Sequence, residues 1–157
     1  MIKPEHLEIL QREESGLAVA NALEILLRED RHLLQIDANE RSITFRFAMH
    51  LQQQVRPWHV DCEYNRNGLV PKRLFMLPLD PGRGDEEART VFPDVIVHQR
   101  GGENRLVIEF KKSSSTVPYE TDKEKLRNYK EQLRYPHGLF IVLEVGANPG
   151  IKHLEWI

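Results

Sequence analysis

The sequence predicts an α/β fold with a central mixed β-sheet flanked by helices. Helical periodicity fills the first third of the chain, and strand-like runs separated by turn signals follow it. One more helical segment precedes a last apolar run, LFIVLEV, which is apolar enough to be covered on both faces. A sheet with helices packed on its faces is the arrangement that buries all of these elements.

Length and composition favour one domain over residues 1–157. Of the 157 residues, 40% are hydrophobic and 29% are charged, as is usual for a soluble globular protein. No apolar run approaches the roughly 20 residues that span a bilayer, and the start, MIKPEHLEILQREE, is unlike a signal peptide. The single cysteine, Cys62, excludes an internal disulfide and a cysteine-cluster zinc site. We therefore expect a cytoplasmic protein without a membrane partner.

The first predicted elements are helices. Residues 1–36 form a predicted N-terminal helical segment, because apolar side chains recur there near helical spacing. A further helix is predicted from Asp37, since Asp37 and Glu40 have the spacing of a capping box and apolar residues then follow on one face. Pro57 is expected to end this helix.

Strands are predicted in the middle of the chain. The run WHVDCEY at residues 58–64 is predicted as the first strand, and PGRGDEE at residues 81–87 is expected to be an exposed loop. Residues 91–98 and 106–110 are predicted to pair as a β-hairpin, because the turn between them contains two glycines that can adopt positive φ.

A helix and a strand complete the predicted order. Thr121 and Glu124 have the spacing of a second capping box, and Pro136 is expected to end the helix that they begin. The core face of this helix is expected to carry Leu126, Tyr129 and Leu133. Residues 139–145 form the last predicted strand.

Three charged side chains interrupt the predicted hairpin. Glu109 and Lys111 are two residues apart on one strand, so their side chains project to the same face, while Phe110 points the other way. Asp94 begins the apolar run of the partner strand. A hairpin whose turn is centred on the two glycines places Asp94 opposite Glu109.

Two carboxylates that face each other repel unless a cation lies between them. Hard divalent cations such as Mg²⁺ accept carboxylate oxygens together with substrate phosphate and water. A neighbouring lysine can orient a water molecule, help to deprotonate it, or offset the charge on a phosphate. Asp94, Glu109 and Lys111 together therefore indicate metal-assisted hydrolysis of a phosphodiester.

These residues resemble the motif of the PD-(D/E)XK nuclease superfamily, also called restriction-endonuclease-like. Pro93-Asp94 and Glu109-Phe110-Lys111 match the two halves of that motif. The predicted order of elements over residues 38–145 is similar to the αβββαβ core of the superfamily. The resemblance implies an enzyme that uses Mg²⁺ or Mn²⁺ to cleave nucleic acid, with DNA as the expected substrate.

The resemblance also implies a role for each site residue. Asp94 and Glu109 are expected to hold the metal ion, with the backbone carbonyl of Phe110 as a further ligand. Lys111 is expected to position the attacking water. An acid on the helix before the core often joins the metal site in this superfamily, and Glu40 is the candidate here.

Basic residues are concentrated in the segment that carries these motifs. Residues 99–135 contain nine basic and six acidic side chains, whereas residues 1–40 contain four basic and nine acidic ones. Lys123, Arg127 and Lys130 recur at helical spacing, so they are expected to form a basic stripe that contacts backbone phosphates. The alternative for this stripe is a solvated helix face relieved by neighbouring glutamates.

A second class of function stays open at this stage. A catalytically inactive module with the same fold could bind a protein or a nucleic acid, and the acidic first third could serve a homodimer or a larger assembly. The response of the melting temperature to Mg²⁺ or Mn²⁺ separates the two classes, because only a protein with a metal site is stabilised by the ion.

Overall fold

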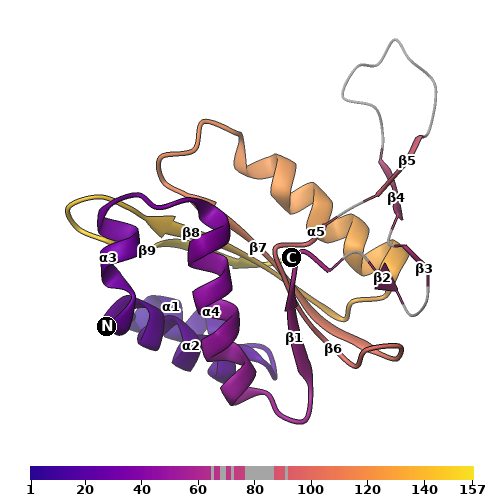
Figure 1. The fold of residues 1–157 in the computed structure, drawn as a ribbon, viewed down its shortest axis with the longest axis horizontal. Coiled ribbons are helices and arrows are strands. Elements are labelled where there is room, and N and C mark those ends of the chain that lie inside the picture. The colour runs from indigo at the N-terminus through magenta and orange to yellow at the C-terminus, as the bar shows by residue number, and fades with distance from the viewer. Residues whose placement is uncertain (65, 68–69, 72, 77–86, 91) are drawn as a thin grey trace.

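The computed structural model describes residues 1–64, 66–67, 70–71, 73–76, 87–90 and 92–157 (Figure 1). Of the loop expected at residues 81–87, only Glu87 lies within these ranges, at the start of a short strand. The helices are α1 (Pro4–Leu10), α2 (Gly16–Glu29), α3 (Arg31–Gln35), α4 (Glu40–Gln54) and α5 (Tyr119–Leu133). The strands are β1 (His59–Cys62), β2 (Arg66–Asn67), β3 (Val70–Pro71), β4 (Arg73–Met76), β5 (Glu87–Thr90), β6 (Val95–His98), β7 (Asn104–Lys112), β8 (His137–Glu144) and β9 (Gly150–Trp156).

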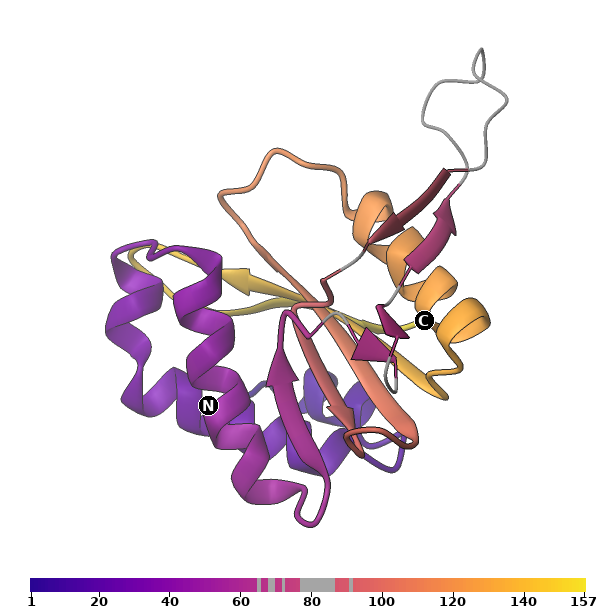
Figure 2. The same cartoon turned by 45° about the vertical axis from the view of Figure 1, so that its right-hand side comes forward.

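A five-stranded mixed sheet forms the centre of the fold, in the order β1-β6-β7-β8-β9. Neighbouring strands in it are antiparallel except β7 and β8, which are parallel and are connected through α5. A crossover helix is the usual link for such a pair, because a tight turn cannot join strands that run in the same direction. The pairs β2–β3 and β4–β5 form two small antiparallel ribbons outside this sheet (Figure 2).

Helices cover both faces of the sheet. The four N-terminal helices, coloured indigo to purple in Figure 1, lie against one face, and α5 lies against the other (Figures 1 and 2). On the first face, Phe47 of α4 contacts Phe110 of β7 edge-on, with ring centroids 5.0 Å apart. Both rings are buried, and full burial of such a side chain stabilises the folded state by about 1.5–3 kcal/mol. The predicted α/β fold with a mixed sheet flanked by helices is confirmed.

The N-terminal segment is helical, as predicted, but it is divided into α1, α2 and α3. Gly16 begins α2 directly against the end of α1. A Cβ at this position would lie 1.6 Å from the carbonyl oxygen of Leu10, so only glycine allows this approach. Among the described residues, no helix has both the length and the apolar character that crossing a membrane requires.

The capping box predicted for Asp37 and Glu40 is wrong. Asn39 is the N-cap of α4, and its side chain accepts a hydrogen bond from the Ser42 amide at 2.8 Å. Asp37 instead follows α3 in a left-handed backbone conformation, with φ 51°. Its carboxylate pairs with Lys112 of β7 at 2.8 Å, so its side chain contacts the sheet and does not cap the helix.

The start of the last helix and the final strand also differ from the prediction. α5 begins at Tyr119 behind Pro118, and no described side chain caps it, so the capping box expected from Thr121 and Glu124 is wrong. The backbone of Pro118 is extended at ψ 140°, which directs the chain into the helix before Thr121 is reached. The expected core face of α5 is confirmed, because Leu126, Tyr129 and Leu133 are all buried. Strand β9, which pairs with β8 at the edge of the sheet, was not predicted.

Candidate functional site

The side chains of β7 alternate between the two helical layers. Val107 packs in the apolar cluster under α5, whereas Ile108 and Phe110 pack in the cluster under the N-terminal helices. Glu109 and Lys111 share the parity of Val107, and both form ion pairs with residues of α5. The prediction that this acid and this amine share one face of the sheet is therefore confirmed.

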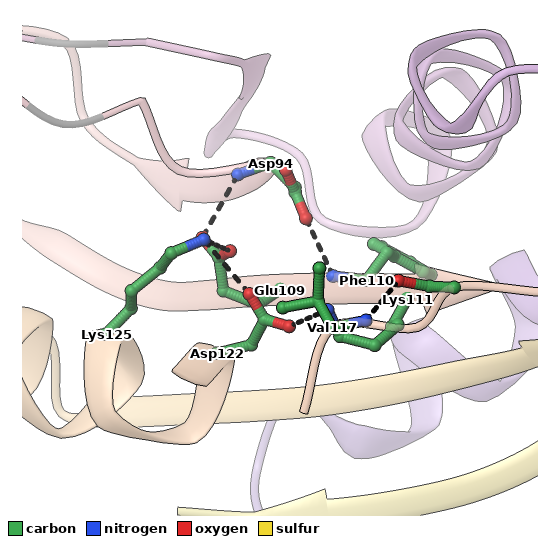
Figure 3. Close-up of polar contacts among 8 residues, drawn as sticks. Asp94, Glu109, Phe110, Lys111, Val117, Asp122 and Lys125 are labelled. Carbon is green, nitrogen blue, oxygen red and sulfur yellow. Dashed lines mark hydrogen bonds and ion pairs between the residues drawn. The ribbon is translucent and has the colours of Figure 1, made fainter. Parts of the chain in front are cut away.

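Asp94 lies beside Glu109 at the start of the predicted hairpin. Val95 of β6 pairs with Ile108 of β7, and continuing this register brings Asp94 opposite Glu109. The Asp94 amide donates a hydrogen bond to Glu109 Oε1 at 3.4 Å, and Asp94 Oδ2 accepts one from the Phe110 amide at 2.8 Å (Figure 3). Each acid is therefore tied to the backbone of the neighbouring strand.

Two residues of α5 that were not predicted complete the cluster. Asp122 Oδ2 lies 2.5 Å from the ammonium of Lys111, and Asp122 Oδ1 accepts a hydrogen bond from Lys125 Nζ at 3.0 Å. The Lys125 ammonium also lies 3.4 Å from Glu109 Oε2 (Figure 3). The side chains of Glu109, Lys111 and Asp122 are 2–7% exposed, whereas Lys125 is 36% exposed.

A signal for these two residues is present in the sequence. Asp122 precedes Leu126 by four positions and Lys125 precedes Tyr129 by four, so both lie near the stripe that was predicted to face the sheet. They were missed because charged residues on a helix usually face solvent. Charged groups on a sheet-facing stripe need buried partners, and Glu109 and Lys111 are the charged pair predicted on the adjacent strand.

Burial changes the ionisation of the two acids on the hairpin. It raises the pKa of Asp94 to about 7, although the hydrogen bond from the Phe110 amide acts in the opposite direction. Burial also holds the pKa of Glu109 well above its ordinary value, and the negative charge of Asp94 adds to this effect. Two carboxyl groups so close together in a buried place favour either a shared proton or a cation.

The groups around Glu109 respond to its charge. Burial lowers the pKa of Lys125, but the charge of Glu109 and the contact with Asp122 outweigh it, so this pKa lies above its ordinary value and Lys125 stays an ammonium. Burial and the charges of Glu109 and Asp94 raise the pKa of Tyr129, which therefore stays a neutral phenol. The α5 face thus presents to Glu109 one permanent cation and one uncharged hydroxyl.

Glu40, the first residue of α4, borders this cluster. Burial is the main cause that raises its pKa, and the charges of Lys111 and Asp122 also act on it. Lys112 leaves β7 on the opposite face, and its ammonium donates a hydrogen bond to the Ala38 carbonyl at 2.9 Å. Lys112 therefore holds the loop before α4 against β7, and Glu40, which follows this loop, lies at the edge of the site.

The basic residues predicted to contact nucleic acid lie on α5, and each has a partner within the chain. Lys123 pairs with Glu155, and Lys130 donates a hydrogen bond to the backbone carbonyl of Ile157. Arg127 pairs with Glu120 at 2.6 Å, and both of these side chains are more than half exposed. Arg127 is therefore the member of the stripe that a phosphate could reach with the least rearrangement.

The oxygen ligands at the site suit a hard divalent cation. Asp94 and Glu109 offer carboxylate oxygens from adjacent strands, and Mg²⁺ commonly takes one or two carboxylates and completes its coordination with water and phosphate. Within the described ranges, no group of three or more His, Cys, Asp or Glu side chains is arranged to hold a metal ion. The protein contribution would thus be two carboxylates, with the Phe110 carbonyl as the predicted further ligand.

No protein-family model, curated protein or solved structure matches this chain. The chemical capacity of the site therefore follows from its own geometry. The half-buried Asp94, directly before β6, and the buried Glu109 of β7 can share a cation or a proton, and a buried ammonium on the same face can orient a water molecule or a phosphate oxygen.

In the absence of metal ions, the wild-type protein is expected to lose stability relative to an Asp94→Asn variant as the pH rises from 3.8 to about 7. In the unfolded chain this carboxyl group releases its proton near its ordinary pKa of 3.8, whereas the folded state keeps the proton up to about pH 7. Stability that depends on the proton is complete below the lower value and is lost as the pH passes through the upper one. Asparagine does not ionise, and its side-chain oxygen can still accept the hydrogen bond from Phe110.

Thermal unfolding of both proteins over this pH range, in the presence of a chelator, would measure the effect. A difference in melting temperature that stayed constant with pH would contradict the raised pKa of Asp94.

Proposed function

We propose that this protein is a metal-dependent nuclease of the PD-(D/E)XK type, which hydrolyses phosphodiester bonds in nucleic acid, with DNA as the expected substrate. The observation that carries the proposal is the meeting of Asp94, Glu109 and Lys111 on one face of the β6–β7 hairpin. Nothing in the packing of an ordinary sheet requires a buried carboxylate, a half-buried one and a buried amine there, since apolar residues would fill the same space without a desolvation penalty.

The order of elements supports the same assignment. With the ribbons β2–β3 and β4–β5 set aside, the order α4, β1, β6, β7, α5, β8 agrees with the αβββαβ order of a restriction-endonuclease-like core over residues 38–145. The hairpin carries both halves of the motif, and the crossover helix α5 covers the face on which the charged groups gather.

The roles of the residues follow from their positions. Asp94 and Glu109 would hold a Mg²⁺ or Mn²⁺ ion, which when bound supplies a Lewis acid that polarises the phosphate and acidifies a water molecule. Lys111 would donate a hydrogen bond to the attacking water, and its contact with Asp122 restricts where the ammonium can lie. Glu40 adds a further carboxyl group at the border of the site. Lys123, Arg127 and Lys130 would contact the phosphate backbone from the surface of α5.

The purified protein is expected to cleave DNA with Mg²⁺ or Mn²⁺ and to be inactive in a chelator. Plasmid, linear duplex, single-stranded DNA and RNA, assayed in parallel, would identify the substrate. The same ions should raise the melting temperature of the wild type but not of Asp94→Asn, because a ligand that binds only the folded state stabilises it. If the wild type neither cut any of these substrates nor responded to the ions, the proposal would be abandoned.

One observation favours a second candidate, a non-catalytic binding module. The Lys125 ammonium already offsets the charge of Glu109 and Asp122, so part of the acidic cluster is neutralised without a metal ion. For such a module, the melting temperatures of the wild type and Asp94→Asn would respond equally to Mg²⁺, and neither protein would cut nucleic acid.

A further inference from the structure

The charged cluster between β7 and α5 contains more acids than amines. Asp94, Glu109 and Asp122 contribute three carboxyl groups, and Lys111 and Lys125 contribute two ammonium groups (Figure 3). Buried carboxylates need compensating charge, because removing them from water is unfavourable unless they are paired. The position of each amine therefore decides which acid remains available to another cation.

The two amines are held differently. Lys111 lies on β7 itself, is 7% exposed and pairs with Asp122 at 2.5 Å. Lys125 lies on α5, is 36% exposed and divides its contacts between Asp122 at 3.0 Å and Glu109 at 3.4 Å. Lys125 is thus the amine that has access to solvent, and its contact with Glu109 is the longer of the two. It can leave Glu109 by rotating its side chain, without any movement of the backbone.

A divalent cation bound to Glu109 would lie close to this ammonium. Like charges a few ångströms apart repel strongly in a site of low exposure, so the ammonium and the ion cannot both occupy the side of Glu109 that carries Oε2. Asp122 would still accept Lys125 after such a rotation, since these residues are three positions apart on one helix.

We propose that Lys125 is a built-in competitor of the metal ion. Its ammonium balances Glu109 in the metal-free protein, and it withdraws from Glu109 when a divalent cation binds between Asp94 and Glu109. The inference rests on the proposed function, because it requires that the ion binds to these two acids. It assigns to Lys125 a role that differs from that of Lys111: Lys125 stabilises the metal-free fold and reduces the affinity for the metal.

Replacing Lys125 by methionine removes the charge and keeps most of the length of the side chain. The Lys125→Met variant is expected to bind Mn²⁺ at least about tenfold more tightly than the wild type in a calorimetric titration, which corresponds to about 1.4 kcal/mol. In a chelator the variant should melt at a lower temperature than the wild type, and saturating Mn²⁺ should reverse the order. Lys152→Met is the matched control, because Lys152 pairs with Glu144 on the β8–β9 edge at 3.3 Å and, within the described part of the chain, forms no ion pair with a residue of the site.

An affinity of Lys125→Met for Mn²⁺ that equals or falls below that of the wild type would overturn the inference while leaving the nuclease proposal intact. If the wild type and Asp94→Asn both showed no binding of Mn²⁺, the proposed function would fail and the inference would fail with it. Should Lys125→Met not fold, the double variant Lys125→Met/Asp122→Asn keeps the net charge of the cluster and is compared with Asp122→Asn alone. The double variant should bind Mn²⁺ more tightly, and equal binding would overturn the inference.

Discussion

Replacing Lys111 with methionine is expected to reduce Mg²⁺-dependent cleavage by about 10²–10⁴-fold, the range associated with losing a positioned group that handles a proton. Methionine fills nearly the same space but cannot donate a hydrogen bond to the attacking water. The fold should survive, because Asp122 keeps Lys125 as a partner at 3.0 Å after Lys111 is lost. The rate of cleavage at saturating Mg²⁺, together with a circular dichroism spectrum at the assay temperature, would measure both effects.

The control for this variant is Lys152→Met, which makes the same chemical change in a partly exposed ion pair. Its activity should equal that of the wild type. Asp94→Asn, purified in parallel, reports any contaminating nuclease, because it should be inactive for an independent reason. A Lys111→Met protein that cuts DNA as fast as the wild type would show that the amine on β7 takes no part in the reaction.

Replacing Asp122 with alanine is expected to lower the free energy of unfolding by about 3–5 kcal/mol, because it leaves a buried cation without its partner. The side chains of Asp122 and Lys111 are each only 7% exposed and lie 2.5 Å apart. Lys125 loses less than Lys111 does, since its ammonium still has Glu109 as a partner and has access to solvent. Urea denaturation at neutral pH in a chelator would give the difference from the wild type.

Glu120→Ala is the appropriate comparison, because Glu120 also lies in the first turn of α5 but pairs with Arg127 in an exposed position. Loss of such a surface pair should change the free energy of unfolding by no more than about 1 kcal/mol. In the background of Lys111→Met, Asp122→Ala should be less destabilising, since the buried cation is already gone. Equal effects of Asp122→Ala and Glu120→Ala would mean that the buried pair does not stabilise the fold.

The parts of the fold that were predicted correctly depend on patterns that a single stretch of sequence contains. The two-residue alternation in β7 places Glu109 and Phe110 on opposite faces, and the helical stripe of α5 includes Tyr129. The repeat of each element was therefore enough to predict which of its side chains face the core. The turn, where Gly101 has φ 77°, was predicted from its two glycines, but the strands reach the register that brings Asp94 opposite Glu109 only through an irregularity between Val97 and His98, which the sequence did not reveal. The two periods and the turn needed no knowledge of distant contacts.

The features that were missed depend on contacts between distant segments. Asp37 looked like a helix cap, but it pairs with Lys112, which lies far along the chain, and Asn39 caps the helix instead. Strand β9 was not predicted because GIKHLEW mixes charged and apolar residues, as is usual for an edge strand with one face open to solvent. Asp122 was missed because its buried partner, Lys111, lies on another element.

Among the described residues, the charged groups that meet at the site come from residues 94–125, that is, from one hairpin and the helix that follows it, apart from Glu40 at its border. A short contiguous stretch of the gene would therefore encode the reacting groups of the site. The N-terminal helical layer contributes packing, because Phe47 of α4 contacts Phe110 on the opposite face of β7. Descendants of such a protein could exchange their outer helices and surface ribbons, and so acquire new partners, while they inherit the same reacting groups. Divergence among relatives would then concentrate outside residues 94–125, in the helices and ribbons that surround this stretch.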